Sequence, residues 1–172
     1  MRWRLLERIR ELTPGEFAVA QANASFPDEL FADHFPSYPV TPGVLLAEMG
    51  AQLSGLLVQA TVLARDQGWV FPLLGLIERA KFRRPVSPGT SLEVHSRIEL
   101  LRSDASLCEA RVVAPAGLVA EMRLMLVYQF SEEYSSGDPA ILERCARLEF
   151  QRLESPWQPP PLVTFSECLP AK

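Results

Sequence analysis

Two side chains near the start of the sequence could move protons: the imidazole of His34 and the carboxyl group of Glu48. His34 stands between Phe31 and Phe35 in a proline-rich stretch. Histidine titrates near neutral pH, so it can act as a general base or acid, although a packed and hydrogen-bonded histidine is the simpler structural interpretation. The residue type alone leaves both roles open for His34.

Glu48 lies among apolar neighbours, which include Leu45, Leu46 and Met49. A carboxyl group in such surroundings must be paired, protonated or functional. Burial disfavours its charged form and the positive end of a helix favours it, so the sequence leaves its charge open. An imidazole and a carboxyl group would together suit the general base and general acid of a proton-transfer reaction.

A third chemical feature is the segment Pro42-Gly43-Val44, where glycine opens the expected helix. The first backbone N–H groups of a helix have no partner within it, and glycine lets a ligand approach them closely. These donors could hold a carbonyl oxygen and stabilise the negative charge that forms when its α-proton leaves. A simple loop-to-helix turn is the alternative.

The element that must position these groups is a helix that begins at Gly43. Apolar or small residues recur there at nearly helical spacing, and Gly68 is the expected stop. This pattern is apolar almost all round, which is typical of a buried helix. The preceding stretch, residues 25–43, carries prolines at 27, 36, 39 and 42, so we expect a shaped loop without a helix or central strand.

Strand patterns lie on both sides of this helix. Residues 5–12 and 16–24 predict a hairpin around Thr13-Pro14-Gly15, and residues 92–100 alternate apolar and polar side chains. Residues 107–114 and 118–130 predict two more strands, joined by the turn Pro115-Ala116-Gly117. His95 falls on the polar face, where we expect a solvated histidine without a role. The fold class is therefore α+β, with the helix against one face of an antiparallel sheet.

Length and composition predict one domain with a tail. The chain has 172 residues, 48% of them hydrophobic, and we expect a domain over residues 1–130 and an extension over residues 131–172. Within the extension, residues 138–153 can form an amphipathic helix, and residues 155–161 are a proline-rich extended stretch.

Charge and cysteine usage exclude several function classes. The net charge of −4 argues against a general nucleic-acid binder, and three widely spaced cysteines, at 108, 145 and 168, indicate neither a disulfide framework nor a metal site. No secretory signal is visible, and polar residues interrupt the apolar run 44–64, so we expect a cytoplasmic protein without a membrane span. The local basic cluster Arg79, Lys81, Arg83 and Arg84 has a solvated strand face as its simplest explanation.

Two segments carry a family resemblance. The segment HFPSYPVTPGVLLAEMGAQLSGLL, residues 34–57, resembles the active-site segment of bacterial 3-hydroxyacyl-acyl-carrier-protein dehydratases. The segment GLIERAKFRRPVSPGTSLEV, residues 75–94, resembles a sheet segment of the same family. Similar order and spacing run from about Leu5 to Phe130, and the extension lies outside this resemblance.

The resemblance implies a hot-dog fold, in which a curved antiparallel sheet wraps one long helix, and a homodimer or a trimer of dimers. It implies that His34 removes the α-proton and that Glu48 of the neighbouring chain protonates the departing hydroxyl group. The backbone of Gly43 and Val44 would hold the thioester carbonyl, with Gln52 also in the substrate site. No metal or organic cofactor is implied.

The same resemblance predicts the substrate and its carrier. The substrate would be a thioester of acyl carrier protein or coenzyme A, and the basic cluster would dock the acidic carrier protein or its phosphopantetheine phosphate. Two other functions fit the fold: an acyl thioesterase that needs no histidine in this loop, and a non-catalytic subunit that binds acyl groups.

Overall fold

The computed structural model describes residues 4–32, 34–65, 69–129 and 139–160. Six strands and three helices follow one another in these ranges: β1 (Leu6–Thr13), β2 (Phe17–Asn23), α1 (Asp28–Ala32), α2 (Gly43–Ala64), β3 (Phe71–Phe82), β4 (Ser91–Leu101), β5 (Ala105–Ala114), β6 (Gly117–Gln129) and α3 (Pro139–Arg152). This content confirms the expected α+β class.

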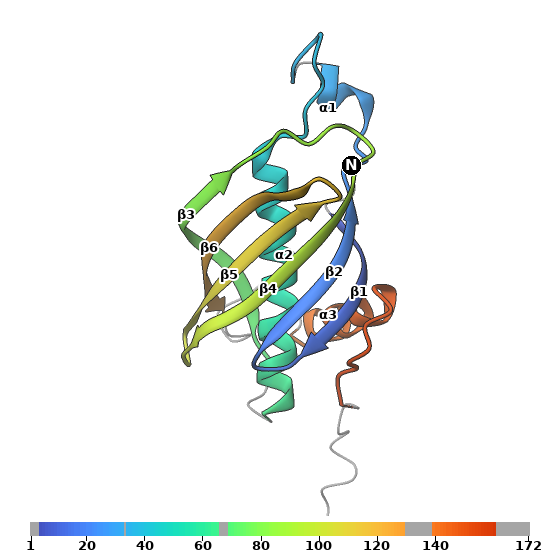
Figure 1. Cartoon of the computed structure of the whole chain (residues 1–172). Helices are drawn as coiled ribbons and strands as arrows, with labels where there is room; N and C mark the ends of the chain where they lie inside the picture. The colour runs from blue at the N-terminus through green and yellow to red at the C-terminus, as the bar shows by residue number, and fades with distance from the viewer. Residues whose placement is uncertain (1–3, 33, 66–68, 130–138, 161–172) are drawn as a thin grey trace, which may run out of the picture.

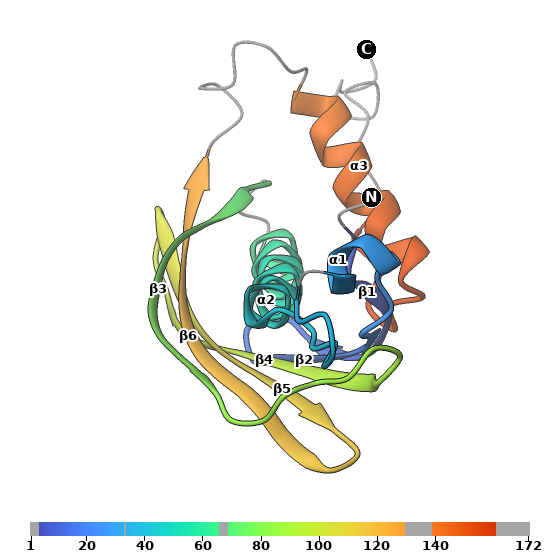
Figure 2. The same cartoon turned by 90° about the horizontal axis from the view of Figure 1, so that it is seen from above.

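The six strands form one sheet in the order β1-β2-β4-β5-β6-β3, and every neighbouring pair is antiparallel. Both predicted turns contain a glycine with positive φ, Gly15 at +85° and Gly117 at +107°, a conformation that other residues rarely adopt. Figures 1 and 2 show the sheet curving around α2, so that the helix lies in its concave face.

Helix α2 is the centre of the core, as its apolar pattern predicted. Met49, Leu53 and Leu57 are fully buried, and β2 faces the core with small side chains, among them Ala18 and Ala20. Such small residues let helix and sheet approach closely. Helix α2 is long and apolar enough to cross a membrane by length and composition, but 72% of its most apolar window is buried within the protein, as in a core helix.

One expectation for the proline-rich stretch is wrong, because α1 forms there. Pro27 directly precedes α1, where a backbone N–H would have no partner within the helix, so the missing N–H of proline costs nothing. The carbonyl of Pro27 accepts a hydrogen bond from Leu30 N–H at 3.0 Å. The other prolines follow Ala32, so a helix of five residues fits between them. Helix α2 ends at Ala64, and the stop expected at Gly68 lies outside the described residues.

The helix predicted near the end of the chain is confirmed as α3, which packs against β1. Phe150 and Leu153 are fully buried in the same core as α2, and Ile9 N–H donates to the carbonyl of Leu153 at 2.8 Å. The aromatic ring of Trp157 packs edge-on against Phe150. The domain boundary predicted at residue 130 lies outside the described residues and stays a prediction.

Candidate active site

Glu48 lies on a face of α2 that the sheet leaves uncovered, where a cavity of about 670 Å³ follows the helix. The residues that α2 contributes to this cavity recur every three or four positions: Glu48, Ala51, Gln52, Gly55, Leu56 and Gln59. At 1.5 Å per residue this stripe is about 16 Å long. The volume is in the range of small-molecule sites in proteins.

The walls on either side of this stripe come from different elements. The first residues of β3, 71–74, form one wall together with Leu126 of β6. The other wall is made by Arg4, which precedes β1, by Leu6, the first residue of β1, and by residues of α3 and its end. Leucine side chains dominate the β3 wall and charged side chains the α3 wall, so the cavity has an apolar side and a polar side.

A glutamine fixes the carboxyl group of Glu48. The Nε2 atom of Gln52 donates to Oε1 of Glu48 at 2.9 Å, and Oε1 of Gln52 accepts from the backbone N–H of Leu5 at 3.0 Å. Because a backbone N–H can bind only the oxygen of the amide, this second bond turns the NH₂ group of Gln52 toward Glu48. Glu48 and Gln52, predicted separately for the site, are thus brought together.

His34 lies in the loop between α1 and α2. Its backbone N–H donates to the carbonyl of Phe31 at 3.1 Å, and its carbonyl accepts from Val40 N–H at 2.9 Å. The imidazole stacks on the ring of Phe35, with centroids 4.4 Å apart, across a cis peptide bond. His34 is partly exposed and does not line the cavity of Glu48 in the described part of one chain.

The beginning of α2 has the free donors that its sequence predicted. Pro42 precedes the helix and provides no side-chain cap, and no acceptor among the described residues pairs with the N–H groups of Gly43 and Val44. The side chain of Val44 is 72% exposed. A Cβ atom on residue 43 would lie 3.2 Å from the ring of Phe82, so glycine permits close packing here. The N-terminus of α2 can therefore accept an oxygen ligand.

The basic cluster covers the end of β3 and the residues after it. Arg83 forms an ion pair with Glu121 at 2.6 Å, and Arg84 donates to the carbonyl of Ala116. Arg79 and Lys81 are exposed and form no ion pair with the described residues. Two cations of the cluster thus face solvent on an edge strand.

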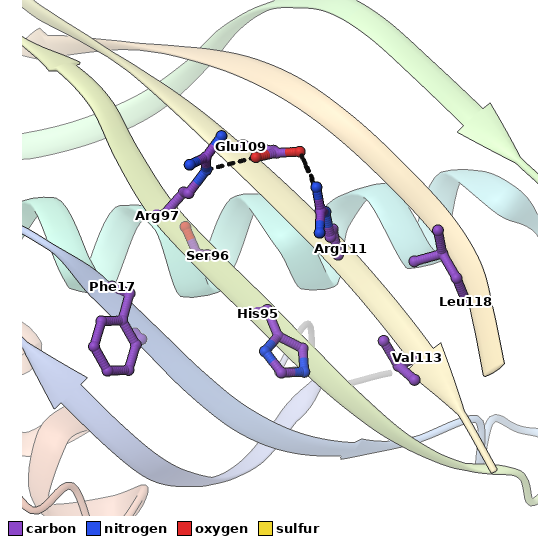
Figure 3. A pocket seen from close by; sticks show the side chains of 9 residues that line it. Phe17, His95, Ser96, Arg97, Glu109, Arg111, Val113 and Leu118 are labelled. Carbon is purple, nitrogen blue, oxygen red and sulfur yellow. Dashed lines mark hydrogen bonds and ion pairs between the residues drawn. The ribbon is translucent and has the colours of Figure 1, made fainter.

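A second concave region, on the outer face of the sheet, contains His95 but not the predicted pair (Figure 3). In this region the carboxylate of Glu109 binds two arginines, with Oε2 2.6 Å from Nε of Arg97 and Oε1 2.9 Å from an Nη atom of Arg111. Nε2 of His95 lies 2.7 Å from Oε1 of Glu93. These charges neutralise one another, and His95 lies on the polar face as predicted. Within the described ranges, no three His, Cys, Asp or Glu side chains gather to hold a metal ion.

Comparison with known proteins identifies the family. A family model described as a FabA-like domain matches residues 1–123. The chain belongs to the FabA-like family. Two curated relatives are both named 3-hydroxyacyl-[acyl-carrier-protein] dehydratase FabZ. That of Oleidesulfovibrio alaskensis is 38% identical over 70% of this chain and 77% of the relative. That of Thioalkalivibrio sulfidiphilus is 41% identical over 70% of this chain and 83% of the relative.

Solved structures show that this FabA-like chain has the hot-dog fold, as expected. The dehydratase heterocomplex ApeI:P from Xenorhabdus doucetiae is 20% identical, with a TM-score of 0.55 over 72% of this chain and 98% of that chain. A hypothetical thioesterase with coenzyme A from Streptococcus pneumoniae is 10% identical, with a TM-score of 0.55 over 71% of this chain and 84% of that chain. At these identities the likeness concerns the fold alone.

Sequence reasoning missed part of the cavity of this FabA-like chain. It did not predict Gly55 and Gln59 as lining residues, although their spacing from Glu48 on one helix face was a usable signal. It also missed Arg4 and the residues of α3, and no pattern in the sequence indicates that α3 folds back to this place.

Proposed function

We propose that the chain dehydrates 3-hydroxyacyl thioesters of acyl carrier protein to trans-2-enoyl thioesters in fatty-acid synthesis, with His34 as base and Glu48 as acid. The chain is a hydro-lyase of the FabA-like family. The observation that carries the residue roles is the cavity along α2, where Gln52 orients the carboxyl group of Glu48 in partly apolar surroundings. Both relatives described above are named for this reaction.

In the proposed reaction the imidazole of His34 takes the proton from the α-carbon, and the electron pair of that C–H bond forms the new double bond. The N–H groups of Gly43 and Val44 hold the thioester oxygen while negative charge develops on it. Glu48 donates its proton to the 3-hydroxyl group, so the C–O bond breaks and water leaves. A proton then returns from the imidazolium to the carboxylate, and both groups are restored.

Two copies of the chain would complete the site. His34 does not line the cavity of Glu48 in one chain, and β3 forms an edge of the sheet whose exposed side chains include Leu74, Leu76 and Ile77. An open edge with apolar side chains is a surface that a protein normally covers. Pairing of β3 with β3 of a second copy would cover it and supply His34 to the partner's cavity. This homodimer and a cytoplasmic location are parts of the same proposal.

The carrier would dock beside β3. Arg79 and Lys81 are free to meet an acidic partner, and opposite charges on two surfaces mainly speed their encounter and fix its orientation. Both curated relatives are named for acyl-carrier-protein substrates, so acyl carrier protein is the proposed carrier of the acyl group.

The test is absorbance near the enoyl-thioester band while purified protein is mixed with 3-hydroxyacyl or trans-2-enoyl thioesters. The wild type should interconvert the two in both directions. His34→Ala and Glu48→Gln should each lower kcat by on the order of 10²-fold or more, the scale of general acid–base catalysis, because each removes a proton carrier.

His95→Ala is the matched control, because it removes the other histidine of the chain from the outer face. Its turnover should equal that of the wild type. Release of free thiol without an enoyl product would instead establish a thioesterase. Binding of both thioesters without any turnover would establish a non-catalytic subunit, and either result would refute the proposed function.

A further inference from the structure

The cavity of Glu48 is closed on one side by a helix that the family match does not include. The match ends at residue 123, whereas α3 spans Pro139–Arg152. Cys145, Glu149 and Arg152 line the cavity, and Leu153 follows directly after the helix. Their spacing of four and three residues places the first three on one face of α3. Figure 2 shows β3 and α3 on opposite sides of α2, at the open side of the curved sheet.

Several contacts hold α3 in this position. Arg152 donates to Oε1 of Glu149 at 2.6 Å and to the carbonyl of Leu6 at 3.2 Å. Nε of Arg4 lies 3.7 Å from Oε2 of Glu149. The fully buried Phe150 anchors the helix in the core. The α3 wall is therefore a fixed part of the cavity.

The shape of the cavity indicates what it holds. Its floor is the stripe of α2 that begins at Glu48, and it is open at Gly55, where an added Cβ would meet nothing within 4 Å. Leu56, Leu73 and Leu74 provide an apolar lining from the floor and the β3 wall. An elongated, partly open groove of this kind, leading away from the proposed acid and lined by leucines on one side, suits an extended aliphatic chain.

We propose that the acyl chain of the substrate lies along α2 between β3 and α3, and that α3 determines which chain lengths the enzyme accepts. This proposal rests on the proposed function. It assigns a specificity role to the extension, through the face of α3 that carries Cys145, Glu149 and Arg152.

Cys145→Trp in the full-length protein tests this role, because residue 145 lines the groove and an indole ring there would fill part of it. The measurement is kcat/KM for short-chain and long-chain 3-hydroxyacyl thioesters. The ratio of long over short chains should fall by about tenfold or more, since a small steric mismatch in an apolar pocket has effects of that size.

Arg144→Trp is the matched control, since residue 144 is exposed, adjacent in sequence and absent from the cavity lining. Its ratio should equal that of the wild type. Equal ratios in all three proteins would overturn the role of α3 while leaving the dehydratase intact. A wild type that dehydrates neither chain length would instead refute the proposed function.

A labelling experiment covers the case in which Cys145→Trp does not fold. In a Cys168→Ser variant, a bulky thiol reagent should label Cys145, which is exposed, but not Cys108, which is buried and whose thiol pKa burial raises to about 11. A long-chain enoyl thioester should slow labelling of Cys145, and a short-chain one should not. Equal labelling rates with both thioesters would contradict the proposal.

Discussion

Gln52 connects the proposed acid to the rest of the fold. Its amide lies between the backbone N–H of Leu5 and the carboxyl group of Glu48, at 3.0 and 2.9 Å. The sequence predicted Gln52 for the substrate site, on the basis of the family resemblance, and this remains a prediction. The bond to Leu5 joins residues 47 positions apart, so no local pattern could have predicted it.

The variant Gln52→Leu tests whether Gln52 positions Glu48 or binds the substrate. Loss of a hydrogen bond to a carboxyl group costs about 1.5–3 kcal/mol, so kcat should fall by roughly tenfold or more while KM changes little. Steady-state kinetics over a range of substrate concentrations measures both constants. A rise in KM at unchanged kcat would show that Gln52 binds substrate and does not position Glu48.

At the scale of elements, the sequence predicted α2, the two hairpin turns and α3 from periodicity and turn residues. It missed α1 because a short helix between prolines has too few residues for a periodic signal. It could not predict the position of α3 against β1, since that depends on the tertiary contacts of Phe150 and Leu153. The sequence could therefore predict the α2 side of the cavity but not the side that α3 forms.

The outer face of the sheet provides a prediction on stability. Burial alone would raise the pKa of Glu109, but hydrogen bonds from Arg111 and Arg97 outweigh it and lower the pKa below its ordinary value of 4.5 (Figure 3). This stabilisation is complete above the unfolded-state pKa and is lost as pH falls through the lowered folded-state pKa.

Glu109→Gln should therefore lower the free energy of unfolding by about 0.5–1 kcal/mol at neutral pH, because the arginine partners are exposed and screened. Urea unfolding at neutral pH and at about pH 3 measures the difference, which should shrink at the acidic pH. An equal difference at both pH values would show that packing, not charge, accounts for the loss.

One complete active site would need two copies of the chain. The cavity, the oriented carboxyl group and the free N–H groups at the start of α2 belong to one chain, while His34 lies on a loop away from that cavity. The exposed apolar edge of β3 is the surface at which the second chain would join. In a symmetric dimer each chain would give its histidine and receive its partner's.

A refolding experiment tests the shared site most directly. The His34→Ala and Glu48→Gln proteins are mixed, unfolded and refolded together, and the rate of enoyl-thioester formation is measured. Each variant alone should be nearly inactive, but a mixed dimer carries one intact site. Random pairing of equal amounts should therefore restore about a quarter of wild-type turnover. Turnover that stays at the level of the separate variants, in a mixture shown to contain mixed dimers, would contradict a site shared between His34 and Glu48 of two chains.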